Sequence, residues 1–168
     1  MALALRAVGW RETLAAASRA RLPWLALAVA CHASVVALWA WQTWLLLPAA
    51  LDALRSPRRL GLAVASGLLM KVMEAGGWTA VERAFGLAPR PGSAVLVLAA
   101  TNLASAVPAS PGNLGVYEGA ALLAYTALGV PRDQALALGI VGHIVYLVPF
   151  VGAGWVVLSL AQLRARRD

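Results

Sequence analysis

Apolar residues run through this chain in long stretches that short polar segments separate. The first stretch covers residues 22–47 and ends at Pro48, and a polar loop follows over residues 52–59. A second stretch covers residues 60–81, and the last covers residues 134–161. About 20 apolar residues in a helix cross the hydrocarbon core of a bilayer. The pattern therefore predicts three helices that each span a membrane.

Two shorter helical stretches lie between the second and the last of these spans. They cover residues 93–107 and 114–130, and the first of them is short for a complete crossing. Whether they are two spans or one re-entrant hairpin, they return the chain to the same side. We therefore predict an all-α fold, a polytopic membrane helix bundle of about four or five membrane segments with a broken or re-entrant hairpin around residues 93–130.

The two ends of the chain are basic. Residues 1–21 carry four arginines and are expected to form an interfacial helix. Its apolar face is predicted to hold Leu3, Ala7, Trp10 and Leu14. Residues 164–168 form a basic tail, and residues 22–163 form a single transmembrane domain. The apolar run continues well past Cys31, too far for the core of a signal peptide, so we expect the first span to remain uncleaved.

Composition agrees with a membrane location. Of the 168 residues, 61% are hydrophobic and 12% are charged, against about 45–50% and about 25% in soluble domains. The net charge is +7, but the arginines lie at the ends of apolar runs, which favours lipid headgroups over nucleic acid as partners. Basic residues divide seven to six between the two predicted sides, so charge does not orient the chain.

A break interrupts the apolar sequence between the two short helices. Pro108 and Pro111 have no N–H, and Gly112 permits positive φ. Inside a membrane such a break must be buried in protein or must line a wet cavity. Ser110 or Asn113 would cap the helix that follows, whose free N–H groups favour an anion. The alternative is an ordinary surface loop between two spans, and spacing alone does not decide between them.

Few titratable or polar residues lie inside the predicted segments. Lys71 and Glu74 are three apart and share a helix face, so they form either a self-neutralised pair or a cavity wall with Lys71 facing a phosphate. Glu118 follows the break closely and either faces the interface or carries a proton or a cation partner. His143 and Asn102 are expected to bond between helices or to line a site.

Two further features have simple structural explanations. Gly115 and Gly119 form a GxxxG pair that allows another helix to approach closely. His32 lies in the first span, and it is expected to form a hydrogen bond between helices rather than to relay protons. Two histidines on different spans do not make a metal site without more ligands, and a single cysteine allows no internal disulfide. We expect no metal and no cofactor.

The motifs around the break resemble a known family. They are Asn102-Leu103-Ala104, then VPASPGNLGVYEGA at residues 107–120, and HIVYLVPFVG at residues 143–152. This arrangement resembles the lysylphosphatidylglycerol synthase transmembrane family, also called flippase-like membrane proteins, with Asn113 in place of the second glycine of its motif. The resulting headgroup site comprises Lys71, Glu74, Asn102, Ser110, Asn113, Glu118 and His143. The structural break comprises Pro108, Pro111, Gly112 and Gly115.

The resemblance implies a multi-pass protein of the bacterial inner membrane that binds or translocates an anionic phospholipid or a lipid-linked headgroup. Members of this family are usually about twice as long, so we expect the chain to correspond to the second half, which a second copy or a membrane partner chain would complete. No soluble aminoacyl-transferase domain is present in the sequence, so we expect no enzymatic activity. The alternative is a non-transporting scaffold or accessory subunit of a membrane-associated glycosyltransferase or lipid-modifying enzyme.

Overall fold

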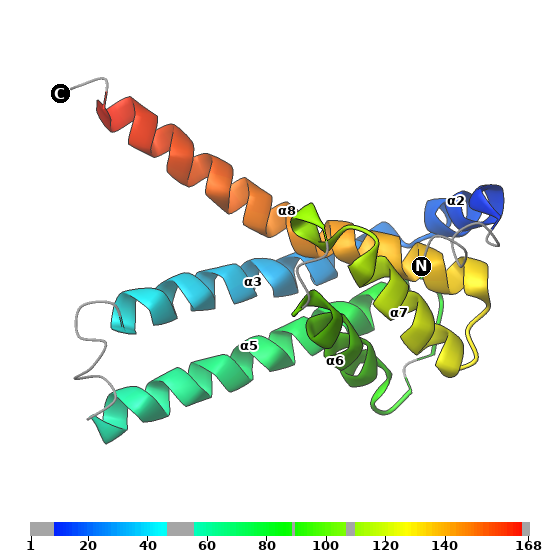
Figure 1. Cartoon of the computed structure of the whole chain (residues 1–168), viewed down its shortest axis with the longest axis horizontal. Helices are drawn as coiled ribbons and strands as arrows, with labels where there is room; N and C mark the ends of the chain where they lie inside the picture. Colours follow the sequence, from blue (N-terminus) through cyan, green and yellow to red (C-terminus); the bar gives the residue numbers. More distant parts are fainter. Residues whose placement is uncertain (1–8, 47–55, 89, 107–109, 166–168) are drawn as a thin grey trace.

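The computed structural model describes residues 9–46, 56–88, 90–106 and 110–165, and this part of the chain is helical with no strand (Figure 1). Three long helices dominate it: α3 (Leu22–Leu46), α5 (Pro57–Ala84) and α8 (Arg132–Ala165). All three are long and apolar enough to cross a membrane. The prediction of an all-α membrane helix bundle is thus confirmed.

Helix α5 is longer than the sequence pattern predicted. It begins at Pro57 behind Ser56, whose hydroxyl accepts a hydrogen bond from the Arg59 backbone N–H. Proline suits a first helical position because the N–H that it lacks would have no partner there. At its other end α5 continues to Ala84, so Glu82 lies in the last helical turn. The predicted apolar stretch ended at residue 81, so the helix extends past its predicted end and includes Glu82.

The short helices α6 (Ser93–Ser105) and α7 (Val116–Ala127) pack against each other, and Figure 1 shows the break between them lying midway along the long helices. At about 1.5 Å per residue they measure about 20 and 18 Å, well short of the roughly 30 Å hydrocarbon core. Both outer ends of the pair lie where α5 ends and α8 begins (Figure 1). Of the two arrangements left open by the sequence, the structure has the re-entrant hairpin.

Helix α2 (Trp10–Ser18) packs against α8 at the same end of the bundle. Thr13 is buried, whereas Leu14, which was predicted to lie on the apolar face, is exposed. Of the predicted interfacial helix, residues 1–8, with Leu3 and Ala7, lie outside the described residues. The Arg21 N–H donates to the Ala84 carbonyl at 2.8 Å. This bond ties the segment before α3 to the end of α5.

The core lies where the hairpin meets the long helices. Its largest fully buried side chains include Trp78, Tyr125, Leu136 and Leu138. Gly139 has no side chain, and this allows α7 and α8 to approach closely. A Cβ at this position would lie 3.2 Å from the Ala121 Cβ. Beyond the hairpin, α8 diverges from the other helices (Figure 1) and presents exposed apolar side chains, as a helix surrounded by lipid does.

The contact between α3 and α5 gives a first testable prediction. A Cβ at Gly77 would overlap the His32 ring, 2.7 Å from Nδ1, whereas a Cβ at Gly67 on the same helix would contact nothing. We expect Gly77→Ala to lower the free energy of unfolding by about 1 kcal/mol, because overpacking outweighs the gain in helix propensity. Gly67→Ala should be neutral or stabilising. Reversible unfolding of the purified protein in mixed micelles measures both, and equal values for the two variants would contradict this packing.

Candidate functional site: a polar cavity at the break

A cavity of about 300 Å³ lies at the break, among α3, α5, α6, α7 and α8. Its polar lining consists mainly of His32, Glu74, Asn102, Asn113 and His143. The structure thus brings together four residues of the predicted headgroup site, and it adds His32 to them. The break lies midway along the long helices (Figure 1), which are long enough to cross a membrane, so in a bilayer this cavity would lie near the centre of the hydrocarbon layer.

Glu118 and His143 form an interhelical pair beside this cavity. His143 Nδ1 lies 2.7 Å from Glu118 Oε1, and the two side chains are only 2% and 13% exposed. A ring that donates from Nδ1 keeps Nε2 as its free nitrogen. The pair joins α7 to α8, as expected for a histidine that bonds between helices. The sequence identified both residues but did not predict that they pair.

Glu118 also caps its own helix. Its second carboxylate oxygen, Oε2, accepts a hydrogen bond from the Gly115 N–H at 2.6 Å, and Gly115 is the N-cap residue of α7. A glutamate three residues after an N-cap can reach back to that backbone N–H. One carboxylate therefore closes the start of α7 and holds the His143 ring.

The break has a tight, left-handed backbone. Gly112 has φ 64°, Asn113 has φ 54° and Gly115 has φ 83°. Asparagine tolerates this region better than most residues, which is consistent with the positive φ of Asn113. Pro111–Asn113 form a single 3₁₀ turn, η2. Pro108 lies outside the described residues.

The two predicted helix caps were wrong. Ser110 precedes the 3₁₀ turn rather than α7 and makes no side-chain cap there. Its hydroxyl instead donates to the Leu114 carbonyl at 2.7 Å. Asn113 lies inside the 3₁₀ turn, and its side chain faces the cavity. Gly115 takes the N-cap position because positive φ is easiest for glycine.

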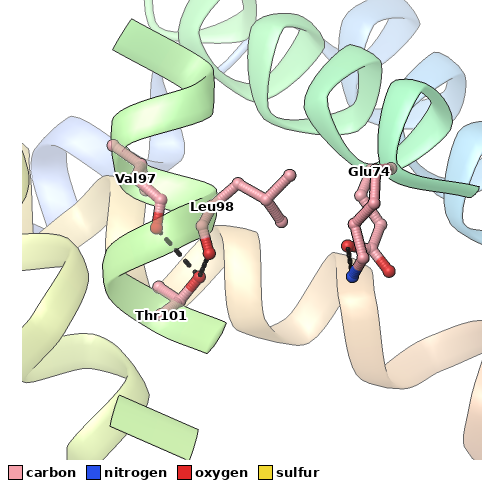
Figure 2. A network of polar contacts seen from close by, with 5 residues as sticks. Glu74, Val97, Leu98 and Thr101 are labelled. Atoms are coloured by element: carbon pink, nitrogen blue, oxygen red, sulfur yellow. Dashed lines mark hydrogen bonds and ion pairs between the residues drawn. The ribbon is translucent and has the colours of Figure 1, made fainter. Parts of the chain in front are cut away.

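Lys71 and Glu74 form the ion pair that their spacing predicted, with Nζ 2.7 Å from Oε2. Glu74 lines the cavity and its side chain is 12% exposed, whereas Lys71 is 56% exposed and does not line it. Figure 2 shows the Leu98 side chain extending from α6 toward Glu74 on α5. These two residues therefore face the same cavity from opposite sides. The pair is the self-neutralised one, and Lys71 does not face a ligand there.

Aromatic rings form the floor of the cavity. Tyr117 stacks on His143, with ring centroids 4.2 Å apart, and on Trp78 at 5.9 Å. Tyr146 stacks on Tyr117 and meets His32 edge to face at 5.7 Å. Tyr117 thus contacts the face of the His143 ring, while Glu118 holds its edge through Nδ1.

The aromatic members of the site were not predicted from the sequence. Trp78, Tyr117 and Tyr146 line the cavity, and none of them was singled out. Tyr117 is adjacent to Glu118, and Tyr146 lies one helical turn after His143. That spacing was the available signal, because residues three or four apart share a helix face.

Comparison with protein families identifies the chain. The protein-family model described as the Lysylphosphatidylglycerol synthase TM region matches residues 49–154. The chain belongs to this family. The matched residues include both partners of the Glu118–His143 pair and the whole break, while His32 lies before them. No curated protein and no solved structure matches the chain. This member of the lysylphosphatidylglycerol synthase TM family is thus an integral membrane protein related to lipid handling.

Proposed function

We propose that the chain receives the headgroup of an anionic phospholipid or lipid-linked molecule in the central cavity and carries it across a bacterial inner membrane. The observation that carries this proposal is a polar cavity of about 300 Å³ at the break of a re-entrant hairpin, inside an apolar bundle. Burying polar groups at bilayer depth is costly. A polar ligand that uses this cavity accounts for that cost.

The lining offers neutral hydrogen-bond donors to a phosphate. Asn102 and Asn113 contribute side-chain amides. Trp78, which also lines the cavity, has a buried indole N–H without a hydrogen-bond partner in the part of the chain that the structure describes. A buried donor without a partner costs about 1–3 kcal/mol. A phosphate oxygen in the cavity would supply an acceptor.

The start of α7 is not the anion site in this proposal. Glu118 accepts the Gly115 N–H with its own carboxylate, so a negative group already occupies that helix end. The Glu74 carboxylate, in turn, is paired with Lys71. The phosphate would therefore be held by amide and indole donors, and no catalytic step is assigned to any of them.

Lipid movement tests the proposal directly. The protein is reconstituted in phosphatidylcholine vesicles that contain a trace of fluorescent phosphatidylglycerol, and dithionite quenching reports the rate of exchange between leaflets. We expect Asn102→Leu, which removes an amide donor without reducing volume, to slow exchange about tenfold. Ser34→Ala is the control, because Ser34 is exposed on α3 and bonds only to its own helix.

Each outcome of this assay has a defined meaning. Exchange that is fast in the wild type and in Ser34→Ala but slow in Asn102→Leu supports the central cavity as the path. If exchange is no faster than in empty vesicles, the proposal that this protein translocates lipid is contradicted. If the wild type and both variants exchange lipid at the same rate, Asn102 does not contact the moving headgroup.

A further inference from the structure

A second cavity of about 150 Å³ lies at the other end of the hairpin, where α5 ends and α8 begins. Its polar side chains are Glu82, Ser93, Tyr125 and Arg90. Apolar side chains and the turn after α7 complete the wall. It shares no lining residue with the central cavity. The proposed function uses none of these residues, so this cavity requires its own explanation.

Glu82 is a buried carboxylate at this cavity. The residue is 2% exposed. It accepts hydrogen bonds from the Ser93 hydroxyl at 2.9 Å and from the Tyr125 hydroxyl at 3.4 Å. Both donors are neutral, and in the described residues no basic side chain lies within ion-pair distance of Glu82. A buried carboxylate is stabilised best by a cationic partner.

Arg90 carries the opposite charge at the same cavity. It is exposed, and its guanidinium donates to the Leu128 carbonyl in the turn after α7. That bond holds the guanidinium over the cavity and leaves further N–H groups for an anion. The cavity thus has a negative interior and a positive rim. This arrangement fits a ligand with a cationic tip followed by an anionic group.

The cavity lies at the end of the bundle where α5 ends and α8 begins. Its lining includes residues of the loop after α5 and of the turn between α7 and α8. Arg83, near this end of α5, lies over the Trp24 ring at 5.3 Å from the centroid. Arginine and tryptophan are enriched together at membrane interfaces. A ligand that enters here comes from the headgroup layer.

We infer that this cavity binds the headgroup of a zwitterionic, ethanolamine-type phospholipid. The primary ammonium lies against Glu82, and the phosphate lies at Arg90. A cavity of this volume accommodates about six non-hydrogen atoms, the size of benzene. The aminoethoxy part of the headgroup has about four and fits. Its primary ammonium has three N–H donors for Glu82, whereas a trimethylammonium group has none. The inference does not depend on the function proposed for the central cavity.

Short-chain lipids below their micellar concentration test this site. The apparent melting temperature of the detergent-purified protein is followed as dihexanoyl phosphatidylethanolamine, phosphatidylcholine or phosphatidylglycerol is added. We expect half-maximal stabilisation at a concentration about tenfold lower for phosphatidylethanolamine than for phosphatidylcholine. Glu82→Gln should raise the phosphatidylethanolamine concentration about tenfold, because it removes a charge-assisted hydrogen bond. Glu12→Gln, at an exposed glutamate of α2, is the matched control and should respond as the wild type does.

Two further arms complete the experiment. Glycerophosphoethanolamine, which has the same headgroup without acyl chains, should stabilise far less; equal stabilisation would mean a soluble amine rather than a lipid. Arg90→Gln should weaken the stabilisation by phosphatidylethanolamine. If Glu82→Gln does not fold, this variant tests whether the cavity binds that lipid. An equal response of the wild type to the ethanolamine and choline lipids, or an unchanged response in both variants, would overturn the inference. Stabilisation by phosphatidylglycerol reports on the central cavity, and Glu82→Gln should not change it. The two proposals can therefore fail independently in this experiment.

Discussion

Replacing Glu118 with alanine is expected to lower the free energy of unfolding by about 2–4 kcal/mol. The substitution leaves the Gly115 N–H at the start of α7 without its acceptor. It also leaves His143, which is 2% exposed, without its partner on α7. Both groups are at the break, where water does not replace the lost bonds at low cost. Reversible unfolding of the purified protein in mixed micelles measures the change.

Glu118→Gln separates the hydrogen bonds from the charge. The amide oxygen still accepts from the Gly115 N–H, and the amide N–H₂ donates to His143 Nδ1 in the other neutral tautomer. We therefore expect a loss of only about 1 kcal/mol. The double variant Glu118→Ala/His143→Ala should be less destabilised than the two single losses combined. A Glu118→Ala protein as stable as the wild type, or strictly additive losses, would show that the pair does not hold α7 to α8.

The sequence could predict the elements because their signals are local. The apolar runs gave α3, α5 and α8, and the Lys71–Glu74 pair followed from spacing on one helix. The helix caps at the break could not be assigned in the same way. Ser110 and Asn113 are good capping residue types, but the positive φ at Gly115 places the N-cap later. The Gly115 and Glu118 positions match the spacing of a capping box, and that pattern was the signal to use.

The contacts between helices needed the structure. Glu118 and His143 are 25 residues apart, and nothing in a single sequence states that α7 and α8 face each other at this register. Glu82 shows the same limit, because a glutamate next to an arginine near a predicted helix end suggests an exposed loop. Its burial depends on Ser93 of α6 and Tyr125 of α7, which pack over it. The packing of the α6–α7 hairpin therefore determines which charged side chains are buried at a cavity.

Gly142→Ala should disturb both the fold and the central cavity. A Cβ at Gly142 would lie 2.6 Å from Trp78 Cζ3 and 2.7 Å from Cη2. Trp78 is 2% exposed and stacks on Tyr117, so a shift of its ring away from Gly142 would disturb that stack. Overpacking of this kind costs about 1–3 kcal/mol, and we expect a loss of about 2 kcal/mol in the unfolding measurement.

Gly152 provides the matched control on the same helix, because a Cβ there would contact nothing within 4 Å. Gly152→Ala should be neutral or stabilising by up to about 1 kcal/mol, since alanine is the better helix former. If Gly142→Ala were as stable as Gly152→Ala, the close approach of α8 to Trp78 would be wrong. A destabilised Gly142→Ala protein that also loses lipid exchange would instead tie the cavity directly to this helix contact, because Trp78 and His143 both line it.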